Sequence, residues 1–204
     1  RHGLFLVFLG IEDGTNAGLK RLNKKLSVSA AMKGVEILKH LEIGFDYGFM
    51  LFQPSTTFRT LLENIAFLKQ LCADGYTPAT FLKLVPFYDT RVASELEKEG
   101  RLKISRYGMD YDFSEDQMAC CYDFISGCFN DWIEKPEGFE NISKWARNYF
   151  SVWLHFNNSQ PEVTALLKEL RSIVSEANIF MLDTMRAIAL IFKSRQNSDV
   201  MSPF

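Results

Sequence analysis

Apolar runs alternate with amphipathic segments along the first hundred residues. Apolar runs occupy Leu4 to Leu9, where all six residues are apolar, Phe45 to Phe52 and Phe81 to Phe87. Runs of this length that end at glycine or proline are typical of strands buried on both faces of a parallel sheet. Each run is followed by a segment whose apolar residues recur every three or four positions, which predicts a helix. We therefore expect three β-then-α units, with parallel strands joined by right-handed crossovers.

The second half of the chain keeps the helical period throughout. Its apolar residues predict helices from about Ser114 to Trp132, from about Phe139 to Phe156 and from about Val163 to Phe192. Such a series of helices with short breaks is typical of a bundle. The sequence thus predicts an α/β part over residues 1–113 and a helical extension over residues 114–204.

Charge and composition narrow the class of protein. The 204 residues carry 23 Lys and Arg against 25 Asp and Glu, a net charge of −2, so no basic surplus favours a nucleic-acid partner. With 47% hydrophobic residues, the chain can bury a stable core. No apolar run approaches the ~18 residues of a membrane helix, so we expect no membrane partner. Four cysteines without disulfide-framework spacing favour a reducing compartment, the cytoplasm.

The cysteines and histidines suggest neither a metal site nor a catalytic triad. Cys121 and Cys128 lie seven residues apart on a predicted helix, among apolar neighbours such as Ile125. This spacing matches no zinc or iron–sulfur motif and favours packing in a core. The three histidines are scattered, without a serine or cysteine partner nearby in the sequence. We therefore assign no metal ligand and no catalytic residue.

Aromatic residues recur at helical spacing near the end of the helix predicted from about Phe139 to Phe156. Because no basic cluster surrounds them, a packing face is favoured over a platform for stacking nucleic-acid bases. The group consists of Trp145, Tyr149, Phe150, Trp153 and Phe156.

The segments that follow the three apolar runs are the places to look for a ligand site, because parallel α/β sheets bind ligands at the carboxyl ends of their strands. These segments are Gly10–Thr15, Gln53–Thr57 and Pro86–Thr90. Their glycines and hydroxyl residues let backbone amides approach a polar ligand, and Glu12 is the carboxylate suited to a ribose or an ammonium group. Taken singly, each segment is equally typical of ordinary turns and helix caps.

Taken together and in order, these segments resemble a known family. The resemblance is to the latter half of radical S-adenosylmethionine enzymes, and within them to the cobalamin-binding-domain class, often labelled Fe-S oxidoreductases. It covers roughly residues 1–113. The matching motifs are Phe8–Thr15 with Leu19–Lys24, Gly48–Thr57 with Glu63–Leu68, Val85–Thr90 with Leu96–Leu102, and Asp110–Phe113.

The resemblance implies a fold and a set of cofactors. It implies a partial (β/α)6 barrel that binds S-adenosylmethionine across its strand ends, with a [4Fe–4S] cluster to reduce it and, in this class, cobalamin. The present strands would be the fourth, fifth and sixth. Glu12 would contact the ribose or amino group, Gly10 would allow close backbone approach, and the other positions would border the adenosyl part or the substrate. The cofactor-binding residues implied are Gly10, Glu12, Gln53, Pro54, Pro86 and Phe87.

The chain departs from the family at one decisive point. The cluster motif C-x-x-x-C-x-x-C is nowhere in the sequence, and no cobalamin-binding domain is recognisable. Without three thiolates there is no cluster to deliver an electron. We therefore expect the cluster-binding half to lie upstream of Arg1, and the chain alone to be inactive and to hold no cofactor tightly. The alternative is a non-enzymatic α/β-plus-helical interaction module.

Half of a barrel would leave an open sheet edge. The strand from Leu4 to Leu9 would lack its neighbour, and inward-facing Phe5, Val7, Phe49 and Leu51 would be short of packing partners. We expect this edge to be covered by the missing amino-terminal half or by a second copy of the chain, and hence a homo-oligomer.

Overall fold

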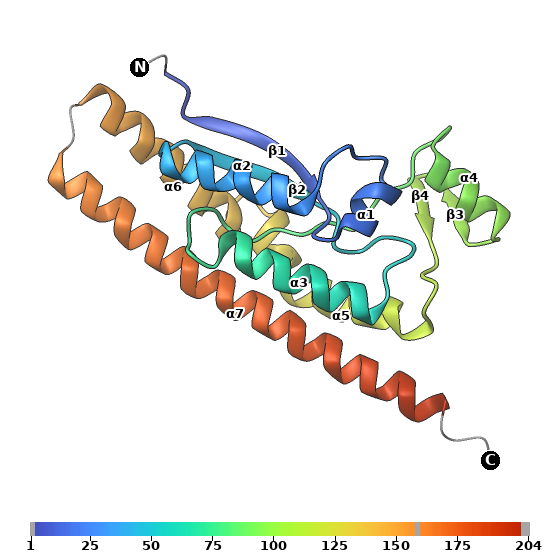
Figure 1. Ribbon diagram of the computed structural model, residues 1–204. Coiled ribbons are helices and arrows are strands. Elements are labelled where there is room, and N and C mark those ends of the chain that lie inside the picture. Colours follow the sequence, from blue (N-terminus) through green and yellow to red (C-terminus); the bar gives the residue numbers. More distant parts are fainter. Residues whose placement is uncertain (1–2, 158–159, 201–204) are drawn as a thin grey trace.

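The computed structural model describes residues 3–157 and 160–200. Its main sheet consists of β1 (Leu6–Glu12) and β2 (Gly44–Phe49), which pair in parallel with Leu6 opposite Gly44. Between them lie α1 (Asn16–Arg21) and α2 (Val28–His40), and α3 (Phe58–Cys72) follows β2. Figure 1 shows α2 and α3 on one side of these strands and α5 and α6 on the other. The mixed α/β class predicted from the sequence is confirmed.

The predictions of a third parallel strand and of half a barrel are wrong. The run from Phe81 to Phe87 forms only an isolated parallel bridge, between Phe52 and Lys83. Three backbone hydrogen bonds tie it to Phe49, the last residue of β2, and to Phe52, with N···O distances of 2.8–3.2 Å. Pro86, which has no N–H, stops the ladder from growing, and the exposed Val85 packs against no second layer. The parallel sheet of the described residues therefore has two strands.

A β-hairpin that the sequence reading missed follows α4 (Arg91–Lys98). Its strands are β3 (Leu102–Ser105) and β4 (Gly108–Tyr111), which pair in antiparallel fashion. The Tyr111 hydroxyl donates a hydrogen bond to the Phe52 carbonyl at 2.9 Å. This bond joins the hairpin to the carboxyl end of the main sheet.

Three helices make up the second half, as predicted. They are α5 (Asp116–Glu134), α6 (Phe139–Phe156) and the long α7 (Pro161–Val200). In Figure 1, α7 runs the length of the molecule, and it packs against α3, α5 and α6. Among the described residues, no helix is long and apolar enough to cross a membrane.

Asn178 of α7 joins the helical part to the α/β part. Its side-chain oxygen accepts a hydrogen bond from the Ala79 N–H at 2.7 Å, and its nitrogen donates to the carbonyls of Cys72 and Thr77 at 2.6 and 2.9 Å. Only 2% of Asn178 is exposed. A buried amide with all three bonds made fixes how α7 lies against α3.

The core lies between the sheet and helices α2 and α3 and continues among α3, α5 and α7. Phe45 stacks on Tyr76 and Phe49 on Phe67, both with ring centroids 5.7 Å apart. The sequence-based expectation that Phe49 and Leu51 lack packing partners is therefore wrong, because both are fully buried. Side chains alternate along a strand, so the odd-numbered residues of β2 face these helices.

Candidate functional site

Glu12 occupies an irregular position at the carboxyl end of β1. Leu9 pairs with Tyr47 and Glu12 with Phe49, so β1 carries one extra residue, a β-bulge. The φ of Glu12 is 63°, in the left-handed region that costs a non-glycine residue about 1–2 kcal/mol. Its carboxylate pairs with Lys24 Nζ at 2.5 Å. The bulge thus re-aims a carboxylate at the strand end.

Gly10 lies beside this ion pair. A Cβ added to Gly10 would be 3.5 Å from Glu12 Oε1 and 3.6 Å from Lys24 Nζ, both ordinary contacts. The fold therefore has room for a side chain at position 10, and the glycine leaves an exposed gap next to the Glu12 carboxylate.

The carboxyl ends of β1 and β2 are joined by a buried contact between Asp13 and Gln53. Asp13 Oδ2 accepts a hydrogen bond from Gln53 Nε2 at 2.6 Å, and Asp13 Oδ1 accepts from the Thr15 N–H and hydroxyl at 2.7 Å each. Asp13 and Gln53 are only 4% and 3% exposed. The sequence analysis singled out Glu12 in this segment and missed Asp13. An aspartate two residues before a threonine cap was the available signal.

The loop around Asp13 is closely packed against α1 and α3. The Gly14 N–H donates to Asn64 Oδ1 of α3 at 2.7 Å. A Cβ at Gly18 would lie 2.1 Å from the Asp13 carboxyl group, so α1 approaches this carboxylate as closely as glycine allows. Gln53 Nε2 also donates to the Met50 carbonyl at 3.1 Å. The Gln53 amide nitrogen is therefore engaged within the fold.

The remaining predicted residues differ in exposure. Pro54 is buried, and its carbonyl accepts a hydrogen bond at 2.9 Å from Arg101 Nη1, which also donates to the Asp112 carbonyl at 2.7 Å. Pro86 is buried, whereas the neighbouring Phe87 is 69% exposed. Arg101 thus joins the second strand end to the hairpin, and the ring of Phe87 stays exposed.

Lys83 is enclosed by aromatic rings close to the second strand end. Its Nζ lies 4.8–5.4 Å from the ring centroids of Tyr111, Phe113 and Tyr122 and pairs with Asp110 at 2.5 Å. Burial acts to raise the pKa of Asp110, but the hydrogen bond and charge of Lys83 outweigh it and hold that pKa below its usual value. Lys83 therefore binds the third apolar segment to the hairpin and to α5.

A second group of buried charges lies where α6 meets the sheet. Arg147 of α6 donates to Asp46 Oδ1 of β2 at 2.8 Å and to the Phe45 carbonyl at 3.1 Å. Glu140 is only 6% exposed. Its Oε1 accepts a hydrogen bond from Lys144 at 2.5 Å, and its Oε2 has no hydrogen-bond partner among the described residues. Burial raises the pKa of Glu140, against the opposing charge of Lys144.

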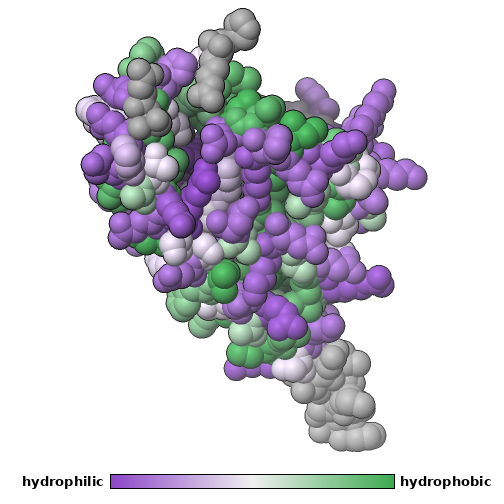
Figure 2. Space-filling view, turned by 60° about the vertical axis from the view of Figure 1, so that its left-hand side comes forward, coloured by the Kyte–Doolittle hydropathy of each residue, from purple (hydrophilic) through white to green (hydrophobic). Residues whose placement is uncertain are grey.

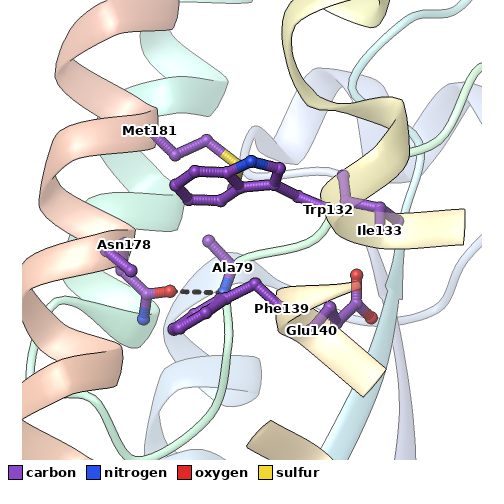
Figure 3. Close-up of a pocket in the computed structure, with 8 residues that line it drawn as sticks. Ala79, Trp132, Ile133, Phe139, Glu140, Asn178 and Met181 are labelled. Carbon is purple, nitrogen blue, oxygen red and sulfur yellow. Dashed lines mark hydrogen bonds between the residues drawn. The ribbon is translucent and has the colours of Figure 1, made fainter. Parts of the chain in front are cut away.

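Glu140 lines a small cavity. The close-up in Figure 3 shows Trp132 and Phe139 beside it, with Asn178 bonded to Ala79 across the gap. The cavity measures about 10 Å³. Since a single water needs about 10–15 Å³, no organic cofactor fits there.

The thiols do not gather into a metal site. Cys72 and Cys121 are buried, as expected for Cys121, and burial raises the pKa of each to about 12. Cys120 and Cys128 are exposed, so the expectation that Cys128 packs in the core is wrong. Among the described residues, no group of three or more His, Cys, Asp or Glu could hold a metal ion.

The aromatic group of α6 is not the packing face that the sequence suggested. Trp145 and Phe156 are each 77% exposed, and Tyr149 is 61% exposed. The face of α6 turned to the rest of the protein instead carries polar residues, including Glu140 and Arg147. Helical spacing identifies an apolar face but not the side on which it packs.

Comparisons with known proteins give a likeness of fold. No family model and no curated protein matches the sequence. Three solved structures match, all of the cobalamin-dependent S-adenosylmethionine radical enzyme OxsB. The predicted resemblance is confirmed for the fold. The form with aqua-cobalamin bound has a TM-score of 0.51 and 13% identity, over 98% of this chain and 38% of that one.

The other two structures agree with the first. The form with aqua-cobalamin and S-adenosylmethionine bound has a TM-score of 0.51 and 13% identity, over 97% of this chain and 37% of that one. The apo, selenomethionine-labelled form has a TM-score of 0.50 and 14% identity, over 96% of this chain and 37% of that one. The chain therefore spans less than two fifths of the enzyme that it resembles.

Proposed function

We propose that this chain is the carboxyl-terminal part of a radical S-adenosylmethionine, iron–sulfur enzyme of the cobalamin-binding class. The observation that carries the proposal is the match of nearly the whole chain to just over a third of OxsB, whose structures contain cobalamin and S-adenosylmethionine. The order of the strand-end motifs in the sequence supports it independently. The proposal places the enzyme in the cytoplasm, where thiols stay reduced.

In this proposal the end of β1 binds the polar part of S-adenosylmethionine. The Glu12 carboxylate would accept hydrogen bonds from the ribose hydroxyls or the ammonium group. Lys24 holds that side chain in place, and Gly10 leaves room beside it. A strained φ at a strand-end bulge is typical of functional positions, which favours Glu12 as a ligand contact.

The second and third segments would border the adenosyl part or the substrate. The exposed ring of Phe87 is suited to stacking on a planar group. The Gln53 amide nitrogen is engaged with Asp13, so Gln53 acts here by fixing the loop that carries Pro54. Pro86 fixes the backbone immediately before Phe87.

The iron–sulfur cluster and cobalamin do not fit the residues present. The described residues offer no group of metal ligands, and the cavity at Glu140 is far too small for an organic cofactor. We assign both groups to the remainder of the protein and derive no step through either. The chain alone is expected to be inactive, because it supplies one wall of a site whose electron source lies elsewhere.

The open edge of β1 is where the remainder of the barrel would join. Within the described residues β1 pairs only with β2. Phe8 is 71% exposed and Leu4 is 63% exposed, and Figure 2 shows hydrophobic side chains gathered near the amino-terminal end. An edge strand presents unpaired N–H and C=O groups, so this edge suits additional parallel strands. A second copy of the chain at this edge is the competing arrangement.

A non-enzymatic interaction module is the alternative function. The observation that favours it is the closed pairing of Asp13 with Gln53, which uses two strand-end side chains within the fold. The exposed aromatic residues of α6 also favour an interaction module, because such residues commonly mark interaction surfaces.

Ligand binding by the complete protein tests the proposal. After anaerobic reconstitution, equilibrium dialysis with S-adenosylmethionine should show an affinity that Glu12→Gln lowers by about 5- to 150-fold, or ~1–3 kcal/mol. Glu36→Gln on the exposed face of α2 is the matched control and should leave the affinity unchanged. Equal affinity in the Glu12→Gln protein, together with lower thermal stability, would show that Glu12 is structural.

A further inference from the structure

One face of α6 carries apolar residues at the spacing of a helix–helix seam. Successive positions are three and four residues apart, the heptad pattern by which helices pack in bundles and coiled coils. These residues are Ile142, Trp145, Tyr149, Val152 and Phe156, and their exposed fractions run from 37% to 77%. A face of this kind that stays exposed lacks the partner that its spacing suits.

The neighbouring helix α7 repeats the pattern. Leu166, Ile173 and Phe180 lie seven residues apart and are 48%, 50% and 58% exposed. Leu170 and Ala177 lie between them in the same alternation of three and four but are only partly exposed, and Ala177 lines the small cavity beside Glu140. The ring of Phe180 stacks on Trp132 of α5 with centroids 6.1 Å apart. This contact holds the Phe180 end of the row of apolar residues against α5.

The surface of α6 is also hollowed. A shallow groove of about 390 Å³, wide open to solvent, is lined by Ile142, Trp145, Ala146, Tyr149 and Phe150. Ridges of large side chains beside a groove allow the ridge of another helix to insert. We give the name outer seam to the exposed apolar residues of these two helices. They are Ile142, Trp145, Tyr149, Val152 and Phe156 of α6 and Leu166, Ile173 and Phe180 of α7.

The charges around the outer seam distinguish between occupants. None of its residues is a lysine, arginine, aspartate or glutamate, and the chain has a net charge of only −2, so two copies repel each other weakly. The cations of α6 are Lys144 and Arg147, and both are turned inward to Glu140 and Asp46. A helix that lies on a membrane carries cations on its polar face to meet anionic lipid.

We propose that the outer seam binds a second copy of this chain, so that the two α6–α7 pairs form a four-helix bundle. A two-fold axis would place α6 of each copy on α7 of the other, a self-complementary contact that closes on itself. The inference does not depend on the proposed enzymatic function and uses a surface other than the edge of β1.

The area of the outer seam is sufficient for such a contact. At about 150–250 Å² per aromatic side chain, the exposed fractions of the three α6 aromatics Trp145, Tyr149 and Phe156 amount to roughly 300–550 Å². Phe180 and the four aliphatic positions bring the face close to the ~800 Å² per partner of a standard interface. The largest apolar patch on a typical monomer is only ~300–600 Å².

Sedimentation velocity of the 204-residue chain tests the inference. The unaltered chain is expected to be a dimer at micromolar concentration. Trp145→Lys and Tyr149→Lys should each weaken association at least tenfold while helix content by circular dichroism stays unchanged. The matched controls Phe8→Lys on β1 and Ile104→Lys on β3 replace equally exposed apolar residues and should leave the dimer intact.

Three results would overturn the inference. A monomer at 100 μM is the first, and a dimer that Phe8→Lys dissociates but Trp145→Lys does not is the second, since it places the contact at the sheet edge. The third is a monomer that co-sediments with phosphatidylcholine–phosphatidylserine vesicles and loses this binding in Trp145→Lys. A concentration-dependent blue shift of tryptophan fluorescence that Trp145→Phe reduces would support the dimer independently.

Discussion

The α/β part and the helical part use buried polar residues differently. In the α/β part, Asp13, Gln53 and Asn64 bond to groups within the same part, at the carboxyl ends of the strands. In the helical part, Arg147 and Asn178 bond across to the sheet and to the end of α3. The first arrangement fixes the loops at the strand ends, and the second fixes one part on the other.

The difference explains where the large aromatic residues lie. Because polar bonds fix α6 on the sheet, its apolar face is not needed for that contact and stays exposed. The aromatic residues of β2 are instead fully buried against α2 and α3. An apolar stripe on a helix therefore indicates the core only when no polar contact already holds the helix.

The largest expected effect comes from breaking the junction between the two parts. Arg147→Ala leaves Asp46 half-buried without its cation and should lower the free energy of unfolding by about 3–5 kcal/mol. Urea denaturation at neutral pH measures this loss. In the double variant with Asp46→Asn, the combined loss should be clearly smaller than the sum of the single losses. Additive losses would mean that the pair does not hold α6 on β2.

Crowding the strand-end network should have the next largest effect. Gly18→Ala places a methyl group 2.1 Å from the Asp13 carboxyl group and should cost about 2–3 kcal/mol of stability. The matched control is Gly34→Ala in α2, where nothing lies within 4 Å and alanine should stabilise the helix by ~0.5–1 kcal/mol. Thermal unfolding of both variants provides the comparison, and equal melting temperatures would show that the loop can give way.

A pH dependence should distinguish the junction from the strand ends. Burial raises the pKa of Glu140 above its usual value of 4.5, so the folded protein holds this proton more tightly than the unfolded chain does. Stability should therefore fall as pH rises from about 4.5 through the raised pKa. Lys144 and Asp46 are the charges that act on this carboxyl group, and Arg147 pairs with Asp46.

Glu140→Gln should remove that part of the pH dependence. Denaturant titrations at pH 4.5 and pH 7 measure the difference, with exposed Glu137→Gln as the control. A steeper dependence in Glu140→Gln, or the same flattening in the control, would contradict the assignment.

The smallest expected effect is the relief of strain at the bulge. Glu12→Gly removes a left-handed non-glycine residue and also its ion pair with Lys24, which is worth ~0–1 kcal/mol. The net gain in stability should be at most about 1 kcal/mol, with a loss of S-adenosylmethionine affinity in the complete protein. A stable variant with full affinity would remove Glu12 from the site.

Much of the fold could be predicted because its strands and helices have strong local patterns. β1 and β2 follow from apolar runs, and α7 from its long apolar stripe. The run from Phe81 to Phe87 failed because Pro86 lacks an N–H and because pairing depends on distant partners. The hairpin of β3 and β4 was missed because its strands are only four residues each.

The positions of the strand-end segments could be predicted, but their contacts could not. The strand-end segments were found because chain order locates them, and the roles of Gly10, Glu12 and Phe87 stay predictions. The contact between Asp13 and Gln53 joins residues 40 positions apart, and that between Asp46 and Arg147 joins residues 101 apart. Nothing local in the sequence indicates such pairs.

The central claim is that this chain supplies one wall of a site whose cluster-binding half belongs to the same protein. Determining the coding sequence directly upstream of Arg1 tests it most directly. The account predicts an open reading frame that encodes C-x-x-x-C-x-x-C about one half-barrel before Leu6. A genuine start codon immediately before Arg1, with no such motif upstream, would contradict it and favour the interaction module.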